Sequence, residues 1–288
     1  MMASMACFVL NDTFMKALAG EIPLNQLLFV RGVLTTLAVS IMAWRMNGLM
    51  VRPSRRDSGI IAIRTCAEIC AAYFFLTALF NMPLANVTAI LQALPLTVSL
   101  GAALVFREPI GWRRLLAILV GFVGVVLIVR PGTEGFNVYS LYGLAAVCCV
   151  TLRDLSTRKL SREIPSIFVT LVNSTAIMVV FGLASLASDW VAMDVRANML
   201  TLSAAVLIIG GYLFSIMVMR VGEISFVAPF RYSGLIFALA LGWLAFGEWP
   251  DMLTLLGAGI VMGSGLFTLY REAQLGRRKR ASHGLRRH

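Results

Sequence analysis

The stretch MPLANVTAILQALPLTVSLGAALVFREP, residues 82–109, contains no charged side chain before Arg107. A helix needs about 20 consecutive apolar residues to cross the hydrocarbon core of a bilayer, and this run exceeds that length. A lipid-facing β-strand would instead alternate polar and apolar residues over about ten positions. The unbroken apolar run therefore predicts a transmembrane helix.

The rest of the chain has the same character. Of its 288 residues, 59% are hydrophobic and 14% are charged, whereas a soluble domain has about 25% charged residues. Its mean hydropathy of +0.85 implies more apolar surface than one soluble core of this size could hide. We therefore expect an all-α polytopic membrane protein. Its ten predicted helices lie near residues 1–18, 22–44, 58–80, 83–106, 111–130, 137–158, 165–187, 198–219, 224–247 and 251–270.

Basic residues are distributed unequally between the two sides of this topology. With the amino terminus inside, eighteen of the 25 Lys and Arg residues fall in cytoplasmic loops and the basic tail, residues 271–288. Only Lys16, Arg130 and Arg196 fall in outer loops. This asymmetry follows the positive-inside rule, so we expect both termini in the cytoplasm and a location in the bacterial inner membrane. The net charge of +11 forms no basic face interleaved with aromatics, which argues against nucleic-acid binding.

Several function classes lack their motifs in this sequence. The chain has no GxxxxGK[ST], HExxH or GxSxG motif, so we expect neither an enzyme nor an ATP-driven pump. Its five cysteines form no CxxC pair, and both histidines lie in the tail; we therefore expect no metal and no cofactor. The first apolar run begins at Met1 without a basic region, so no cleavable signal peptide is expected. A channel or a lipid scramblase stays open as an alternative to a carrier.

The two halves of the chain resemble each other at a shift of about 140 residues. Residues 87–108 match residues 227–248, with identical pairs at Val87/Val227, Leu104/Leu244, Phe106/Phe246 and Glu108/Glu248. Further back the shift is 142, and the matching pairs are Cys7/Cys149, Asp12/Asp154, Ile22/Ile164 and Pro23/Pro165. Five helices in each half would invert the second half, as in many secondary transporters. The predicted repeats span residues 1–130 and 137–270; similar composition without common ancestry is the alternative.

Several segments resemble EamA-type carriers of the drug/metabolite transporter superfamily. They are LNDTFMKALAG (10–20), FVRGVL (29–34), the stretch at 82–109, GFVGVVLIVRPG (121–132) and ISFVAPFRYSGLIFALALGWLAFGEWP (224–250). The resemblance implies a helical basket in which helices 1–4 and 6–9 surround a central cavity supported by helices 5 and 10. It also implies alternating-access transport of a small metabolite. Among the subgroups the chain is most similar to bacterial aromatic amino-acid exporters, with carriers of S-adenosylmethionine or another nucleotide-like metabolite as the alternative.

Charged residues inside the predicted spans are candidates for the solute site, because a charge at membrane depth normally faces a partner or a wet cavity. Arg64 and Glu68 are four residues apart on one helix face and within pairing reach. Such a pair predicts binding of a zwitterion, since each charge could exchange its partner for a substrate group. An ion pair that only holds helix 3 against a neighbour is the alternative. Glu68 is also the best-placed carboxylate for proton coupling, although uniport or exchange would need none.

Charges near the helix ends form a second set of candidates. Asp12 is predicted to pair with Lys16 one turn away, and its repeat equivalent Asp154 with Arg158. These pairs could be gates, or they could anchor helix ends at the interface. Further gate or ion-pair candidates within the spans are Arg31 and Arg153.

A third set lies beside prolines in helices 4 and 9. Pro95 and Pro229 each remove a backbone donor, and lipid cannot satisfy the carbonyl that this leaves. Nearby Gln92 and Arg231 are therefore expected to face a cavity, with the planar guanidinium suited to a carboxylate. Together with Arg64 and Glu68 they predict a polar site between helices 3, 4 and 9.

Aromatic residues and glycines complete the candidates. Stacking walls for a ring-bearing solute, or plain core packing, are predicted at Tyr73, Phe74, Phe75, Tyr212, Phe214, Phe230 and Tyr232. Small residues that permit close helix approach occur in helices 5 and 10 at Gly121, Gly124, Gly257, Gly259, Gly263 and Gly265. They suggest tight packing, with a homodimer through helices 5 and 10 as one outcome.

Overall fold

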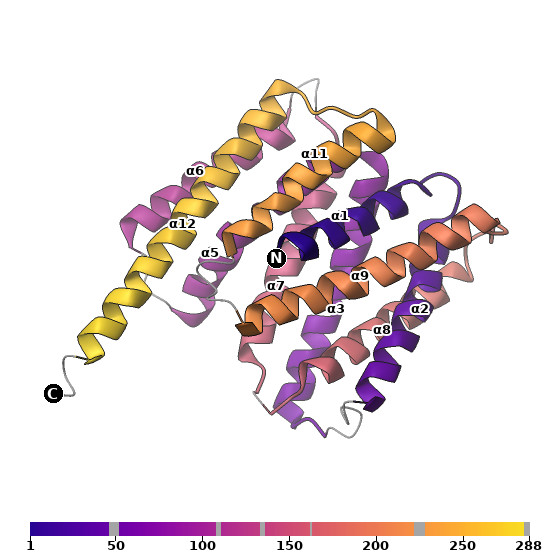
Figure 1. Ribbon diagram of the computed structural model, residues 1–288, viewed down its shortest axis with the longest axis horizontal. Coiled ribbons are helices and arrows are strands. Elements are labelled where there is room, and N and C mark those ends of the chain that lie inside the picture. Colours follow the sequence, from indigo (N-terminus) through magenta and orange to yellow (C-terminus); the bar gives the residue numbers. More distant parts are fainter. Residues whose placement is uncertain (46–51, 108–110, 133–135, 162, 222–227, 285–288) are drawn as a thin grey trace.

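The computed structural model describes residues 1–45, 52–107, 111–132, 136–161, 163–221 and 228–284, and in these ranges the chain is helical without any strand. The elements of the first half are α1 (Met2–Lys16), α2 (Leu24–Arg45), α3 (Arg55–Asn81), α4 (Leu84–Leu91), α5 (Leu94–Phe106) and α6 (Trp112–Val129). Those of the second half are α7 (Tyr139–Lys159), α8 (Ser166–Ser185), α9 (Val195–Val221), the 3₁₀ helix η1 (Ala228–Tyr232), α11 (Ser233–Phe246) and α12 (Met252–Gly284). Figure 1 shows their arrangement.

The observed helices confirm the predicted all-α membrane fold. Each predicted span corresponds to one helix or to two consecutive helical pieces among the described residues. Eight spans are long and apolar enough to cross a membrane by length and composition, counted over the described residues. The other two are α1, which has 15 residues, and α7, which carries four charged residues near its end. The start of the predicted ninth helix, residues 224–227, and residues 285–288 of the tail lie outside the described residues.

The fourth and ninth spans are each broken into two pieces. Pro95 sits in the first turn of α5 and has no N–H for the carbonyl of Leu91, so the helix ends one turn earlier. There the amide of Gln92 bonds to Thr88 O at 3.1 Å and that of Ala93 to Ile90 O at 3.1 Å, in a tighter turn. In the ninth span the break is η1, which contains Pro229 and precedes α11. The breaks expected at both prolines are therefore present.

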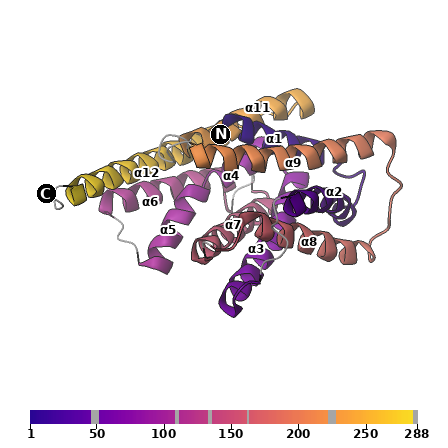
Figure 2. The same ribbon diagram turned by 60° about the horizontal axis from the view of Figure 1, so that its bottom comes forward.

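The helices pack in pairs that each join the two halves of the chain. α1 packs against α9, α2 against α8, α3 against α7, α4 against α11 and α6 against α12. Figures 1 and 2 show α6 beside α12 and α1 beside α9. Exchanging the halves maps this set of pairs onto itself, with α1–α9 becoming α7–α3. The inverted orientation of the repeat itself stays a prediction.

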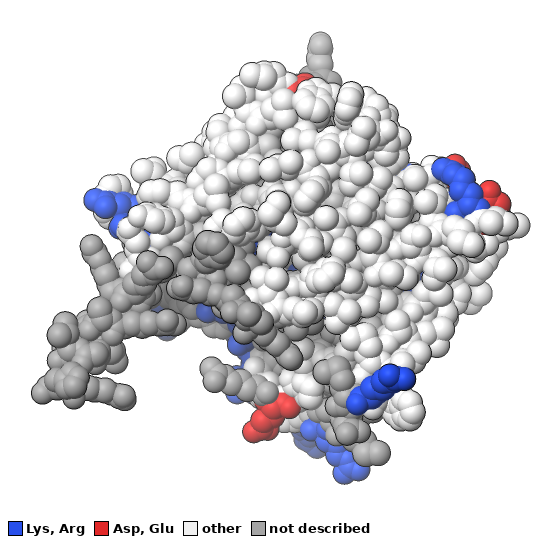
Figure 3. Space-filling model, in the orientation of Figure 1, with Lys and Arg blue, Asp and Glu red and all other residues white. Residues whose placement is uncertain are grey.

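Polar contacts and charges gather at the two ends of the helices. At one end, the Lys16 end, loop contacts join Glu21 to Arg196 at 2.8 Å and Gln26 to the backbone of Val191 at 2.7 Å. At the opposite end, the Arg158 end, buried Asp57 accepts hydrogen bonds from the amide and hydroxyl of Ser161 at 3.2 and 3.0 Å. Figure 3 shows most blue and red atoms at the edges of the face, and the white surface between them carries no charged residue. A surface without charges is expected where a multi-pass membrane protein contacts lipid.

Glycines allow α6 and α12 to approach each other within the chain. A Cβ on Gly124 would lie 2.7 Å from the carbonyl of Gly257, and one on Gly257 would lie 2.6 Å from the carbonyl of Gly124. Gly121 and Gly265 are also closely packed, against Ser264 and Tyr232. Gly259 and Gly263 are exposed, and a Cβ added to either would meet no described atom within 4 Å. Four of the six glycines therefore serve packing inside the chain, and a homodimer through α6 and α12 stays a prediction.

Two neighbouring substitutions on α12 test this packing. Gly257→Ala should lower the midpoint of thermal unfolding in detergent by several degrees, because its Cβ meets a backbone carbonyl and overpacking costs about 1–3 kcal/mol. Gly259→Ala is the matched control and should leave the midpoint unchanged or slightly raised, since alanine is the better helix former. Tryptophan fluorescence during heating measures both. Equal midpoints for the two variants would contradict the assigned α6–α12 contact.

Candidate functional site

A network of charges joins the middle of α3 to the last two turns of α7. Arg153 of α7 donates from Nη1 to both carboxylate oxygens of Glu68 on α3, at 3.2 and 3.3 Å. Its Nε donates to Asp154 Oδ1 at 2.9 Å. The Arg153 and Glu68 side chains are 21% and 15% exposed. One arginine thus serves two carboxylates, in a span where lipid offers no alternative partner.

Arg64 lies one turn from Glu68 but bonds to a different helix. Its Nε donates to Thr157 Oγ1 of α7 at 2.8 Å, and Thr157 in turn bonds to the carbonyl of Arg153 at 2.8 Å. Arg64 Nη1 is buried and has no hydrogen-bond partner among the described residues. The predicted Arg64–Glu68 ion pair is therefore wrong: the carboxylate of Glu68 is bound by Arg153, because α7 brings a guanidinium to it directly.

A second polar group lies between α1 and α2. Arg31 of α2 is 9% exposed and donates to Asn11 Oδ1 at 3.3 Å, while Asn11 Nδ2 donates to Asp12 Oδ1 at 2.9 Å. Asp12 and Arg31 also interact electrostatically. The predicted Asp12–Lys16 pair is wrong, because Lys16 extends to the end of the molecule and binds Glu248 at 2.6 Å.

Tyr212 of α9 lies between these two groups. It interacts electrostatically with Glu68, Arg153, Arg31 and Arg64, and its ring packs edge-on against Phe8 of α1 with centroids 5.3 Å apart. It is nevertheless 44% exposed. Tyr212 thus combines an accessible ring with electrostatic interactions to charges on α2, α3 and α7.

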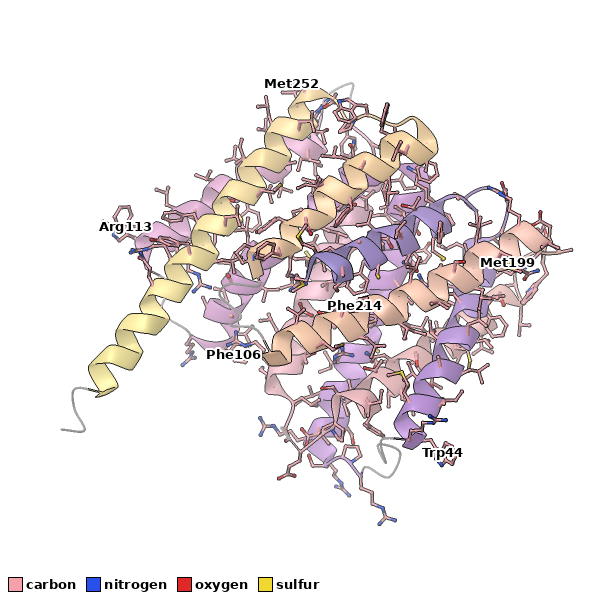
Figure 4. All side chains as sticks on the ribbon, in the orientation of Figure 1. Trp44, Phe106, Arg113, Met199, Phe214 and Met252 are labelled. Carbon is pink, nitrogen blue, oxygen red and sulfur yellow. The ribbon has the colours of Figure 1, made fainter. Side chains whose placement is uncertain are left out.

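Other candidate aromatics are also accessible. Phe214 is 42% exposed and is labelled in Figure 4; it lies two residues after Tyr212 on α9 and therefore on a different face of that helix. Tyr73 of α3 is also 42% exposed and packs on Phe74, which packs on Tyr142 of α7. Phe75 points the other way and packs with the two buried clusters of the core. The structure thus separates Phe75 from the aromatics that stay accessible.

The remaining predicted residues lie away from the charged network. Gln92 Nε2 lies 3.8 Å from the position that a Cβ on Gly234 of α11 would take, beside Met5 of α1. Pro95 is partly buried, and Phe230 and Arg231 are exposed in η1, which packs against α1, α11 and α12. The network is therefore built by α3 and α7 beside α1, α2 and α9. A solute site between the third, fourth and ninth spans, as the sequence suggested, stays a prediction.

Three residues that were not predicted for the site each bond to a predicted charged residue. They are Thr157, Asn11 and Glu248. Glu248 was visible as the repeat equivalent of Glu108, but its partner was not. Chemically, the described part of the site offers both charge signs and ring surfaces for binding. Among the described residues, no group of three His, Cys, Asp or Glu residues could hold a metal ion.

Comparison with known proteins identifies the family. The EamA-like transporter family matches residues 1–130 and 138–270. A riboflavin transporter of Vibrio cholerae is 28% identical over 85% of this chain and 83% of its own. The pseudopaline exporter CntI of Pseudomonas aeruginosa is 27% identical over 88% and 89%, respectively. An S-adenosylmethionine uptake transporter of Rickettsia felis is 27% identical over 69% and 68%.

A solved structure has the same fold. That crystal structure aligns with a TM-score of 0.59 and 20% identity, covering 91% of this chain and 94% of its own. The family and these relatives are transporters and not enzymes, in agreement with the missing catalytic motifs. The resemblance seen in the sequence is thereby confirmed: the chain is a multi-pass membrane protein that belongs to the EamA-like transporter family.

Proposed function

We propose that this chain is a secondary transporter whose solute combines an amino group, a carboxylate and an aromatic ring. The observation that carries the proposal is the Glu68–Arg153–Asp154 network beside an accessible tyrosine, Tyr212. A structural ion pair alone would not need an exposed aromatic side chain in its midst. Charges of both signs in a membrane span are costly and mark solute pathways.

The network can receive a zwitterion without a change in net charge. Arg64, Arg153, Glu68 and Asp154 carry two positive and two negative charges. A substrate ammonium group can take the place of Arg153 at Glu68, while Arg153 stays bonded to Asp154. A substrate carboxylate can bind the buried Nη1 of Arg64, which lacks a partner among the described residues. The exchange at Glu68 replaces one charge-assisted hydrogen bond by another, and the contact at Arg64 adds one, so binding does not strand a charge.

The aromatic side chains supply the second half of the recognition. Tyr212 presents an accessible ring that interacts electrostatically with these charges. An offset-stacked or edge-to-face ring pair adds about 0.5–1.5 kcal/mol beyond the area that it buries. A solute with a ring and an amino-acid group would use both features at once.

Two solute classes fit this description. Aromatic or other hydrophobic amino acids, moved outward, are the first choice because such a solute would use both charge signs of the network and the ring of Tyr212. S-adenosylmethionine, the solute of one relative, also carries an amino-acid group and a ring system. The alternative to both is riboflavin, the solute of another relative, which has a ring system but no amino-acid group. A lipid scramblase or channel would move lipid probes or ions in place of these solutes.

Substitution of the network distinguishes these candidates. Glu68→Gln and Arg153→Gln in proteoliposomes should each lower flux of the transported amino acid or S-adenosylmethionine at least tenfold, because one substrate charge loses its partner. Riboflavin flux, which needs the ring surfaces, should change less than twofold. Radiolabelled flux assays measure all three solutes, with lipid-probe exchange as a fourth readout.

The matched control removes a carboxylate outside the network. Glu21→Gln breaks the exposed Glu21–Arg196 pair at the Lys16 end, where both side chains are more than half exposed, and should leave flux unchanged. Unchanged flux of every charged solute in Glu68→Gln and Arg153→Gln would refute the assigned site. Movement of lipid probes without any of the solutes would refute the transporter proposal itself.

The proposed orientation places both termini in the cytoplasm of a bacterial cell, with the Lys16 end facing outward. In a cysteine-free variant, Phe136→Cys should react with a membrane-impermeant maleimide from outside intact cells. Arg52→Cys should react only after the inner membrane is opened, because eighteen basic residues hold its side in the cytoplasm. Both positions are exposed. The opposite labelling pattern would overturn the orientation and leave the site untouched.

A further inference from the structure

Lys16 forms a fully satisfied charge cluster at one end of the molecule. Its ammonium donates to both oxygens of Glu248, at 2.6 and 2.7 Å, and to the carbonyl of Met82 at 2.6 Å. Glu248 Oε2 also accepts the amide of Leu84 at 3.0 Å. The side chains of Lys16 and Glu248 are 9% and 27% exposed. All three ammonium donors thus have partners in a region sheltered from water.

This cluster ties together segments from both halves of the chain. Lys16 ends α1, Met82 and Leu84 flank the turn from α3 to α4, and Glu248 follows α11. The carboxylate lies at the start of α4, where free backbone amides favour a negative charge. The Lys16 ammonium also lies 5.1 Å from the centre of the Phe246 ring. Any separation of α1 from α11 at this end must break the cluster.

The opposite end carries the repeat equivalents of these residues. Under the shifts that relate the halves, Lys16 corresponds to Arg158, Phe246 to Phe106 and Glu248 to Glu108. The Arg158 guanidinium lies 4.9 Å from the centre of the Phe106 ring, matching the contact of Lys16 with Phe246. Figure 4 labels Phe106 at the end of the molecule away from Met252, which begins α12 just after Glu248. Glu108 lies outside the described residues.

We propose that the Lys16–Glu248 cluster and the Arg158–Phe106 contact are the gates of the transporter, one at each end of the solute pathway. Lys16 and Glu248 hold one end closed in this structure. Arg158 and Phe106 form the corresponding gate at the other end, and opening of one gate accompanies closure of the other. The proposal rests on the transporter function proposed above and assigns its gating residues.

The energetics of the Lys16 cluster suit a gate. A buried ion pair gains little net stability, because desolvation offsets most of its attraction. Once the end opens, water solvates both charges, so closed and open arrangements can have similar free energy. A purely apolar seal of the same size would favour closure far more strongly. The ion pair therefore specifies which groups meet at this end without making the closed arrangement much more stable than the open one.

Accessibility of the site from each side of the membrane tests the gates. The reporter is Tyr212→Cys in a cysteine-free chain, labelled with an impermeant maleimide in vesicles of both orientations. Lys16→Gln and Glu248→Gln should each raise the labelling rate from the Lys16 side about fivefold or more, as expected for loss of a typical coupling between states. Arg158→Gln should raise it from the opposite side. Lys16→Arg, which keeps the positive charge and its donors, should leave the rate near that of the reporter alone.

A matched control and the contrary outcomes make the test decisive. Arg196→Gln breaks the exposed ion pair at the same end and should not change labelling. Equal rates for Lys16→Gln, Glu248→Gln and Arg196→Gln in folded protein, judged by gel filtration and thermal unfolding, would overturn the proposal. If Lys16→Gln does not fold, Glu248→Gln and Lys16→Arg carry the same test. The assay needs no solute, so its result is independent of whether the proposed solutes are moved.

Discussion

Lipid cannot accept a charge or an unbonded backbone group, and this constraint shapes every polar feature of the molecule. The chain satisfies it by packing each helix of one half against a helix of the other, so that charges meet across the pairs. Arg153 on α7 reaches Glu68 on α3 in this way, and Lys16 at the end of α1 reaches Glu248 beyond α11. The same pairing brings small residues of α6 and α12 together at backbone distance. Polar residues therefore lie at the contacts between the halves and at the places where a solute could enter between them.

The proposed transport function assigns three roles to different parts of the molecule. The Glu68–Arg153–Asp154 network, with Tyr212 beside it, lies within the spans and offers exchangeable partners to a charged solute. The Lys16 and Arg158 clusters lie at the two ends, where α1 and α7 finish. α6 and α12 pack together at one side of the molecule and hold the rest in place (Figures 1 and 2). A transporter needs these three parts, namely a site, two gates and a scaffold.

Much of the fold could be predicted from the sequence because its determinants are local. Length and hydropathy fix the ten spans, and Pro95 breaks its helix by lacking one amide. The charged residues of the site could also be named in advance, since any charge in a span is conspicuous. Their partners could not. The four-residue spacing of Arg64 and Glu68 shows only that the two can reach each other, whereas Arg153 binds Glu68 because α7 happens to face α3 at that height.

The same limit explains the other errors. Lys16 was assigned to Asp12 on its own helix, but its long side chain extends past the helix end to a carboxylate more than two hundred residues away in the sequence. Arg231 was expected to face a cavity because Pro229 breaks its helix. It lies exposed in the 3₁₀ helix η1, and its part in a solute site stays a prediction. Non-local packing carries no clear signal in a single sequence.

The central claim is that the Glu68–Arg153 network binds the charged groups of the solute, and a structure of the protein with its transported solute bound tests it most directly. The account predicts a substrate ammonium within hydrogen-bond distance of Glu68, a carboxylate at Arg64, and the ring of the solute against Tyr212. A solute bound instead between Gln92 and Arg231, with the Glu68–Arg153 pair intact and untouched, would contradict it.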